Sequence, residues 1–426
     1  VALVTLVLLI MSSCLPRFRR VQQKTDEINR VARENLTGIN VVHAFGAEDY
    51  QNRKFDGPSR DMMDLQLKNQ RLFALLQPAM GLGMNGLALA IYWVGAALVE
   101  SIARTDMAGR LTMFTNVLVF STYATYVVMS FMMLVMIFML LPQAQVSAER
   151  INEVLNTKPH VVEGSKTEGR ETGTVEFRDV CFRYPHAAAD ELEHISFRVE
   201  RGQTLAIIGA TGSGKTTLAG LIPRFYDATQ GTVLVDGVDV RDYTFDALYD
   251  KLGYVTQKAV LFSGTVQDNI FFGQSEAADT DETLQQALQL SQAAEFVGKY
   301  PDGAAHPIAQ LGRNVSGGQK QRLSIARALA RKPEILIFDD SFSALDYKTD
   351  AALREGLAKQ LPGTTKIIVA QRISTIRHAD QILVLDRGEI AGLGTHDALM
   401  ASCPVYREIA MSQLSEEELK KGGASK

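Results

Sequence analysis

A glycine-rich loop between an apolar segment and a helical segment most constrains what this chain can fold into. Residues 204–208 are apolar and rich in β-formers, which predicts a buried strand, and residues 218–222 form a plausible helix. A loop in this setting brings backbone N–H groups and a helix N-terminus to an anion, as in the phosphate-binding pattern G-x-x-x-x-G-K-[ST]. The pattern is met in order by Gly209, Ala210, Thr211, Gly212, Ser213, Gly214, Lys215, Thr216 and Thr217.

The residue types in this loop predict how it holds a nucleotide. Its glycines let backbone N–H groups converge on the phosphates, and the following helix adds a partial positive charge at its N-terminus. Lys215 is placed to reach the phosphates, and the Thr216 hydroxyl is placed to bind Mg²⁺. We therefore expect ATP and Mg²⁺ as cofactors.

Apolar residues are spread unevenly along the 426 residues, with the long uncharged runs in the first third. The net charge of −4 argues against a nucleic-acid binder that is held by bulk charge. The three cysteines, Cys14, Cys181 and Cys403, lie far apart without metal-ligand spacing, which fits a reduced compartment and no disulfide framework. A membrane part followed by a soluble α/β part is the expected organisation.

Uncharged segments at about residues 1–16, 72–99 and 111–141 are candidates for membrane helices. The first is too short to cross alone, because a bilayer core needs about 20 residues. Since the chain starts inside an apolar run without a charged leader, we expect it to be truncated within a membrane helix. Asn85, Asn116 and Gln77 could line a substrate path or form interhelical hydrogen bonds.

The distribution of charge predicts the orientation of these helices. The long segment between the first two runs holds many Lys and Arg residues, whereas the turn at 100–110 holds only Arg104 and Arg110. The positive-inside rule places the long segment in the cytoplasm and the turn outside. We therefore expect a multi-pass protein of the plasma (inner) membrane with a cytoplasmic nucleotide-binding domain.

Apolar strands downstream of the loop end in polar residues that could complete a nucleotide site. One strand leads into Asp339, which would hold Mg²⁺ through water, and into Asp340. Gln257 could reach Mg²⁺ or the attacking water, or it could be a surface-loop residue. Gln371 ends another apolar strand. Upstream of the loop, Tyr184 could stack on adenine or be an ordinary core aromatic.

A second glycine pair opens a later helix, Lys320 to Leu329. Glycines and a serine at a helix N-terminus make an anion site, and one chain rarely needs two γ-phosphate sites. We therefore expect this segment to serve a nucleotide held by another subunit. A turn that includes Asp346 follows the strand of Asp340. The glycine segment consists of Val315, Ser316, Gly317, Gly318 and Gln319.

From Tyr184 to Gln371, the order and spacing of these motifs resemble the ATP-binding cassette (ABC) ATPases: A-loop, Walker A, Q-loop, VSGGQ signature, Walker B, D-loop and switch loop. The preceding helices resemble the last three of the six in an ABC exporter half-transporter. The implied fold is multi-domain, with a partial all-α polytopic transmembrane domain at residues 1–153, a linker at 154–173, an α/β P-loop NTPase at 174–412 with a RecA-like core plus antiparallel β and helical subdomains, and a polar tail at 413–426.

The resemblance also implies how such chains assemble and react. Two cassettes pair head to tail and sandwich two ATP molecules between the Walker A of one and the signature of the other. A coupling helix at about residues 45–55 docks on the nucleotide domain of the partner, a second ABC half-transporter. Lipid and a transported substrate are the other implied partners, with no nucleic acid. The implied catalytic residues are Lys215, Gln257, Asp340 and Gln371, and the implied metal ligands are Thr216, Gln257 and Asp339.

Three positions depart from the family pattern, and two of them carry the inference. The family places a catalytic Glu where this chain has Asp340 and a His where it has Gln371; Gln310, where Glu is frequent, is a weaker departure. The shorter Asp side chain sets its carboxylate about 1 Å farther from the attacking water, and a displacement of that order costs about a hundredfold in rate. Gln cannot carry the positive charge that His offers to the phosphate.

An intact Walker A and signature beside these departures predict an asymmetric pair. The chain would bind ATP at its own slow site and lend its signature to a fast site whose Glu and His belong to a different subunit. That arrangement resembles the degenerate member of heterodimeric multidrug-type exporters. The alternatives are a homodimeric exporter, an ATP-gated or regulatory membrane protein, and a soluble ABC ATPase acting on DNA or ribosomes, against which the uncharged helices argue.

Overall fold

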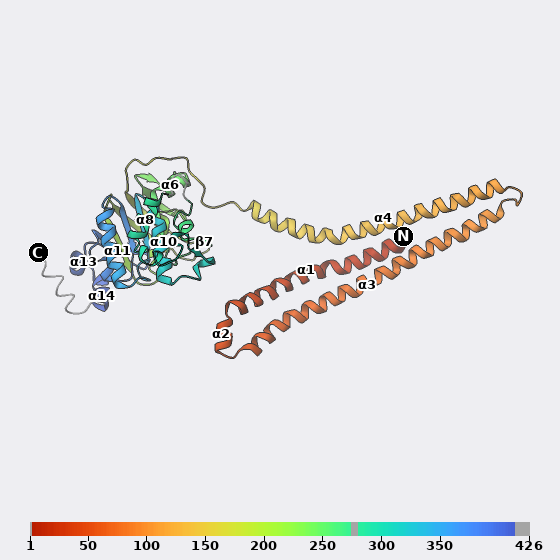
Figure 1. Cartoon of the computed structure of the whole chain (residues 1–426), viewed down its shortest axis with the longest axis horizontal. Coiled ribbons are helices and arrows are strands. Elements are labelled where there is room, and N and C mark those ends of the chain that lie inside the picture. The colour runs from red at the N-terminus through yellow and green to blue at the C-terminus, as the bar shows by residue number, and fades with distance from the viewer. Residues whose placement is uncertain (1, 274–279, 414–426) are drawn as a thin grey trace. The chain divides into compact units, whose positions relative to one another are not determined.

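The computed structural model describes residues 2–273 and 280–413, and for most of residues 2–19 it describes the backbone alone. The chain divides into two compact units, Val1–Lys158 and Pro159–Lys426. The first unit is helical and the second is an α/β unit (Figure 1). This organisation confirms the predicted fold class.

In the helical unit, α3 packs along both α1 and α4 (Figure 1). Ion pairs join the polar parts of α1 and α3, with Lys24 Nζ 2.9 Å from Asp61 Oδ2 and Lys54 Nζ 2.8 Å from Glu34 Oε1. At the other end of α3, the side chain of Asp106 caps α4. The helices are α1 (Ala2–Thr37), α2 (Ile39–Ala44), α3 (Glu48–Ser101) and α4 (Met107–Asn156).

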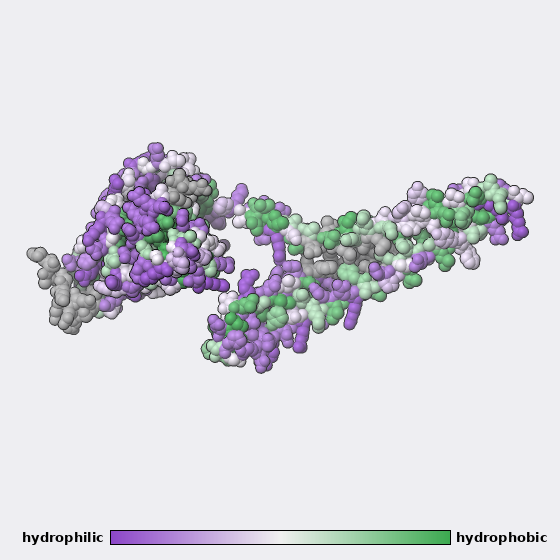
Figure 2. All heavy atoms as spheres, viewed as in Figure 1, coloured by the Kyte–Doolittle hydropathy of each residue, from purple (hydrophilic) through white to green (hydrophobic). Residues whose placement is uncertain are grey.

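Two stretches of the described chain are long and apolar enough to cross a membrane, Glu48–Ser101 and Met107–Phe131. They contain the expected run at 72–99 and much of the run at 111–141. The expected span at 1–16 lies largely outside the residues whose side chains are described. Apolar side chains cover much of the helical surface in Figure 2, and Trp93 is 78% exposed. Such an exposed apolar surface suits contact with lipid.

Two stretches of the expected organisation have other helix bounds in the structure. α2 ends at Ala44, and Gly46 (φ +56°) turns the chain before α3 begins at Glu48, so the stretch at 45–55 that was expected as a coupling helix holds a turn and the start of α3. Its docking on a partner stays a prediction. The expected linker at 154–173 starts inside α4, and its second half is paired with the α/β unit. The backbone N–H of Gly164 donates to Tyr243 O at 2.9 Å.

The described residues of the α/β unit form three sheets. A six-stranded sheet has the order β12-β11-β3-β10-β9-β6, in which all neighbours are parallel except β12 and β11. A four-stranded antiparallel sheet has the order β2-β1-β4-β5, and β7 pairs with β8. The strands are β1 (Val175–Phe182), β2 (Leu192–Val199), β3 (Thr204–Gly209), β4 (Gln230–Val235), β5 (Val238–Asp239), β6 (Leu252–Val255), β7 (Gly264–Thr265), β8 (Pro307–Ile308), β9 (Ile335–Asp339), β10 (Thr365–Val369), β11 (Gln381–Asp386) and β12 (Glu389–Gly394).

Alternating side chains of the parallel strands fill two separate cores. In β3, Leu205 and Ile207 join the core that is shared with the four-stranded sheet, whereas Ala206 and Ile208 join the core under the helices. Burial on both faces explains why these strands are almost wholly apolar in sequence. The helices are α5 (Lys215–Leu221), α6 (Phe245–Lys251), α7 (Val266–Ile270), α8 (Asp281–Leu290), α9 (Ala294–Val297), α10 (Gly317–Ala330), α11 (Tyr347–Gln360), α12 (Ile373–Ile376), α13 (His396–Ser402) and α14 (Pro404–Gln413), with short 3₁₀ turns η2 (Gly303–Ala305) and η3 (Gln310–Gly312).

Candidate functional site

The register of the parallel strands brings the predicted site residues to one edge of the sheet. Val369 of β10 lies opposite both Ile207 of β3 and Asp339 of β9. The phosphate loop follows β3, Asp340 follows β9, and Gln371 comes two residues after β10. In open α/β sheets, ligands bind outside these carboxyl ends. The residues that follow β3, β9 and β10 therefore lie together at this edge of the sheet.

The phosphate loop is closed by Lys215, the first residue of α5. Its Nζ donates to Gly209 O at 2.9 Å and to Ala210 O at 2.7 Å. Burial lowers the pKa of Lys215, although the carboxylates of Asp340 and Asp339 oppose that shift. Gly214 caps α5 with φ +95°, a conformation that non-glycine residues adopt with strain. The loop thus depends on glycine and places a cation at its centre.

Thr216 and Asp339 supply the oxygen atoms expected of a Mg²⁺ site. Thr216 Oγ1 donates to Asp339 Oδ1 at 3.0 Å, and the Tyr254 hydroxyl donates to Asp339 Oδ2 at 3.3 Å. Burial raises the pKa of Asp339, which these two donors partly offset. The described residues contain no group of three or more His, Cys, Asp and Glu side chains that could hold a metal. A hydroxyl beside one carboxylate fits Mg²⁺, which uses one or two protein carboxylates plus phosphate oxygens.

The Asp340 carboxylate lies between two amide side chains. Its Oδ2 accepts from Gln371 Nε2 at 2.7 Å and from Gln257 Nε2 at 3.3 Å. Its backbone N–H donates to Val369 O at 3.0 Å, and its φ of 47° lies in the left-handed region. Burial raises the pKa of Asp340, while the Gln257 amide and the positive charge of Lys215 lower it. Three residues predicted from separate motifs are therefore in direct contact.

Tyr184 lies beside the phosphate-loop helix. Its hydroxyl is 2.9 Å from Thr217 Oγ1. Its ring meets those of Phe182 and Tyr226 edge to face, with centroids 4.8 and 5.2 Å apart. The ring is only partly buried. It can therefore belong to the core and still offer surface next to the loop.

The signature and D-loop residues begin helices of their own. Ser316 caps α10 by accepting from Gln319 N at 3.3 Å, while its own N–H donates to Gln319 Oε1 at 2.8 Å. Ser316 and Gly317 are exposed, whereas Val315 is buried. Asp346 caps α11 through Thr349 N at 3.0 Å. Within the described chain, no hydrogen bond joins residues 315–319 to residues 209–217.

Two residues of the site were missed by the sequence reasoning. Tyr254, which holds Asp339, could have been found from the strand that it shares with the Gln257 segment. Gln413 was expected in a polar tail, but it ends α14. Its Oε1 accepts from Ile373 N at 2.9 Å, and its Nε2 donates to Gln371 O at 2.8 Å. The i, i+4 spacing of the buried Tyr406 and Ala410 is the signal that would have extended the folded domain.

Two family models match the chain. The model of the ABC transporter transmembrane region matches residues 1–131, and the model described as ABC transporter matches residues 192–343. The chain therefore belongs to the ABC transporter family, as a half-transporter in which membrane helices are fused to an ATP-hydrolysing domain. Proteins of this class are membrane exporters whose ATPase domain is cytoplasmic, binds ATP, normally with Mg²⁺, and works in a dimer of two such chains.

Similar proteins agree with this assignment over nearly the whole chain. An uncharacterized ABC transporter ATP-binding protein of Mycobacterium tuberculosis is 42% identical over 95% of this chain and 68% of its own length. An ATP-dependent lipid A-core flippase of Aromatoleum aromaticum is 35% identical over 98% and 68%. A solved bacterial Atm1-family ABC exporter with ATP bound is 30% identical over 98% and 74%, with a TM-score of 0.80.

Proposed function

We propose that this chain is the degenerate-site half of a heterodimeric ABC exporter in the plasma membrane. It binds ATP at a slow site of its own and donates its signature to a fast site on a different chain. The observation that carries the proposal is the Asp340 carboxylate, which is short and is held by the amides of Gln371 and Gln257. A general base for water needs reach and a free lone pair directed at its substrate.

In this proposal, each residue of the chain's own site has a defined part. The loop amides and Lys215 hold the phosphates, and Thr216 and Asp339 hold Mg²⁺. The metal, when bound, neutralises charge that develops on the phosphate oxygens. Asp340 is the weak base, and Gln371 orients it without adding positive charge. Binding is therefore complete, whereas water activation is poor.

The signature supports the second half of the proposal. Ser316 and Gly317 are exposed, and an anion can reach the N-terminus of α10. Their sequence has none of the departures seen at Asp340 and Gln371. A chain that keeps this segment intact beside a weakened base is suited to serve a nucleotide on its partner.

A homodimeric exporter is the second candidate, because one chain carries both an intact phosphate loop and an intact signature. Relatives named as a lipid A-core flippase and as a probable multidrug resistance transporter support an exporter in either case. The two candidates differ in which residues limit ATP turnover. In a homodimer, Asp340 acts in every site, whereas in the heterodimer the fast site uses only the signature of this chain.

The test compares Ser316→Ala with Asp340→Ala in the exporter purified together with its partner chain. We expect Ser316→Ala to slow ATP turnover by about a hundredfold, as loss of one transition-state donor does, and Asp340→Ala to slow it mildly. Thr244→Ala is the matched control, since Thr244 caps α6 just as Ser316 caps α10 but lies outside the site. A larger loss for Asp340→Ala than for Ser316→Ala would contradict the heterodimer.

A further inference from the structure

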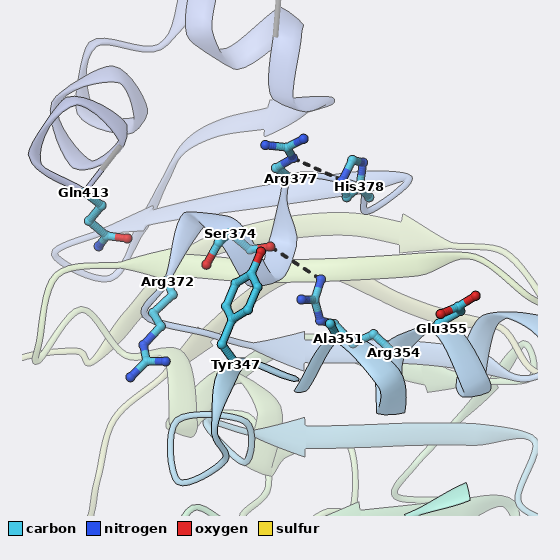
Figure 3. A pocket seen from close by; sticks show the side chains of 9 residues that line it. All are labelled: Tyr347, Ala351, Arg354, Glu355, Arg372, Ser374, Arg377, His378 and Gln413. Carbon is cyan, nitrogen blue, oxygen red and sulfur yellow. Dashed lines mark hydrogen bonds between the residues drawn. The ribbon is translucent and has the colours of Figure 1, made fainter. Parts of the chain in front are cut away.

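A pocket of about 790 Å³ lies beside the segment that carries Gln371. Figure 3 shows side chains from α11, from residues 372–378 and from the end of α14 around it. The lining includes the basic residues Arg354, Arg372, Arg377 and His378 and the acidic residue Glu355. The pocket is therefore basic in composition and belongs to none of the nucleotide motifs.

Two of its guanidinium groups lack a compensating carboxylate. Arg354 is paired with Asp350 at 2.9 Å, and Glu355 is paired with Lys359. Within the described chain, Arg372 and Arg377 form no ion pair. Arg377 Nε instead donates to His378 Nε2 at 3.0 Å. The pocket thus retains the charge of two arginines.

The surroundings of His378 reflect this positive field. The pKa of His378 is lowered by burial first and then by the charges of Arg377 and Arg354. The imidazole accepts a hydrogen bond from Arg377, which requires its neutral form at that nitrogen. A ligand with negative charge would relieve the repulsion between these groups, and arginine favours carboxylate or phosphate oxygens.

A run of acidic residues follows Gln413 in the sequence. Gln413 lines the pocket, and residues 416, 417 and 418 are all glutamate. Three residues of extended chain cover about 10 Å. The tether also gives these carboxylates a high effective concentration at the pocket. Charge and distance therefore favour this segment over any free anion.

We propose that the pocket is a carboxylate-binding site and that its ligand is the acidic run Glu416, Glu417 and Glu418 of this chain. Arg372 and Arg377 supply the guanidinium groups that bind it. Docking fixes the end of α14, where the Gln413 amide binds the backbone of Gln371 and Ile373. The tail is thereby connected to the side chain that holds Asp340. This inference does not depend on how the subunits pair.

The test is disulfide formation between the substitutions Ser374→Cys and Glu417→Cys in the whole exporter, with the three native cysteines changed to alanine. Ser374 lines the pocket and is nearly isosteric with cysteine. We expect oxidation to link the two positions, and we expect the rate to fall about fivefold when Arg372→Gln and Arg377→Gln are added. Raised salt should slow the reaction in the same way when both arginines are present. This second measurement does not depend on whether the arginine variant folds.

The matched control is the double variant Lys420→Gln and Lys421→Gln, which alters the same tail without removing negative charge and should not slow the reaction. We expect the link to form within one chain, because the tail is tethered next to the pocket, and a link that forms only between chains would overturn the proposal. A rate that is unaffected by both the arginine substitutions and salt would mean random collision of a tethered segment and would overturn the proposal.

Discussion

Replacing Asp340 by glutamate should speed up ATP hydrolysis when this chain is assembled with itself. In that assembly, both signatures are the intact segment 315–319, so the departures at Asp340 and Gln371 are what limit the rate. The substitution adds one methylene and leaves the charge unchanged. The outcome therefore reports on the position of the carboxylate alone.

The structure sets the size of the expected gain. In the present chain, Asp340 Oδ2 is drawn toward Gln371 Nε2 at 2.7 Å and Gln257 Nε2 at 3.3 Å. An added carbon–carbon bond of about 1.5 Å carries the carboxylate beyond these donors. Moving the carboxylate about 1 Å closer to the attacking water restores up to about a hundredfold in the rate of hydrolysis, which is about 2.7 kcal/mol of activation free energy. If one hydrogen bond from a glutamine amide, worth about 1 kcal/mol, is lost in exchange, a gain in rate of about twentyfold remains.

The assay is steady-state ATP turnover of the protein in lipid nanodiscs, with ATP affinity measured alongside. Asp346→Glu serves as the control, because Asp346 caps α11 and has the same side chain outside the proposed base position. Adding Gln371→His to Asp340→Glu should raise the rate further by offering a positive charge. Unchanged turnover in Asp340→Glu, with ATP affinity intact, would show that the length of the side chain at position 340 does not limit hydrolysis.

Further predictions concern the elements around the site. Gln413→Ala should raise the hydrogen-exchange rate of the Ile373 amide about fivefold, since it removes a bond worth about 1 kcal/mol; an unchanged rate by exchange mass spectrometry would contradict the contact. Burial lowers the pKa of His396, so as the pH falls the unfolded chain binds a proton at this residue before the folded chain does. The unfolding temperature should therefore fall as the pH drops below about 6.5, and it should fall less steeply in His396→Gln. Gly214→Ala should lower that temperature more than Gly212→Ala, since both have positive φ but only at Gly214 does a Cβ meet other atoms; equal losses would count against that steric argument.

The parts of the fold that follow from local pattern were predictable. Apolar runs that end in Gly209, Asp339 and Gln371 predicted buried strands, and parallel strands bring such ends together at one edge. The signature segment was recognisable for a similar reason, because glycines and serine at a helix N-terminus have a physical role. The charge-free runs likewise predicted the two long apolar helices.

The features that depend on tertiary pairing were not predictable. Residues 163–171 look like a polar linker, yet their backbone is paired with the segment around Tyr243. In the sequence, Tyr254 looks like an ordinary aromatic residue of a strand. Only the pairing of β6 with β9 brings its hydroxyl within hydrogen-bonding distance of Asp339. Gln413 contacts residues about 40 positions earlier in the chain. Local pattern can place Tyr254 on a strand and Gln413 on a helix, but the partner of each side chain is set by tertiary pairing.

ATP turnover per site, measured for the whole protein alone and in complex with its sister chain, would decide whether the two sites differ. We expect slow hydrolysis by the protein alone and much faster hydrolysis in the complex, with the added rate abolished by Ser316→Ala. Equal turnover per site in the two preparations, or brisk hydrolysis by this chain assembled only with itself, would contradict this expectation.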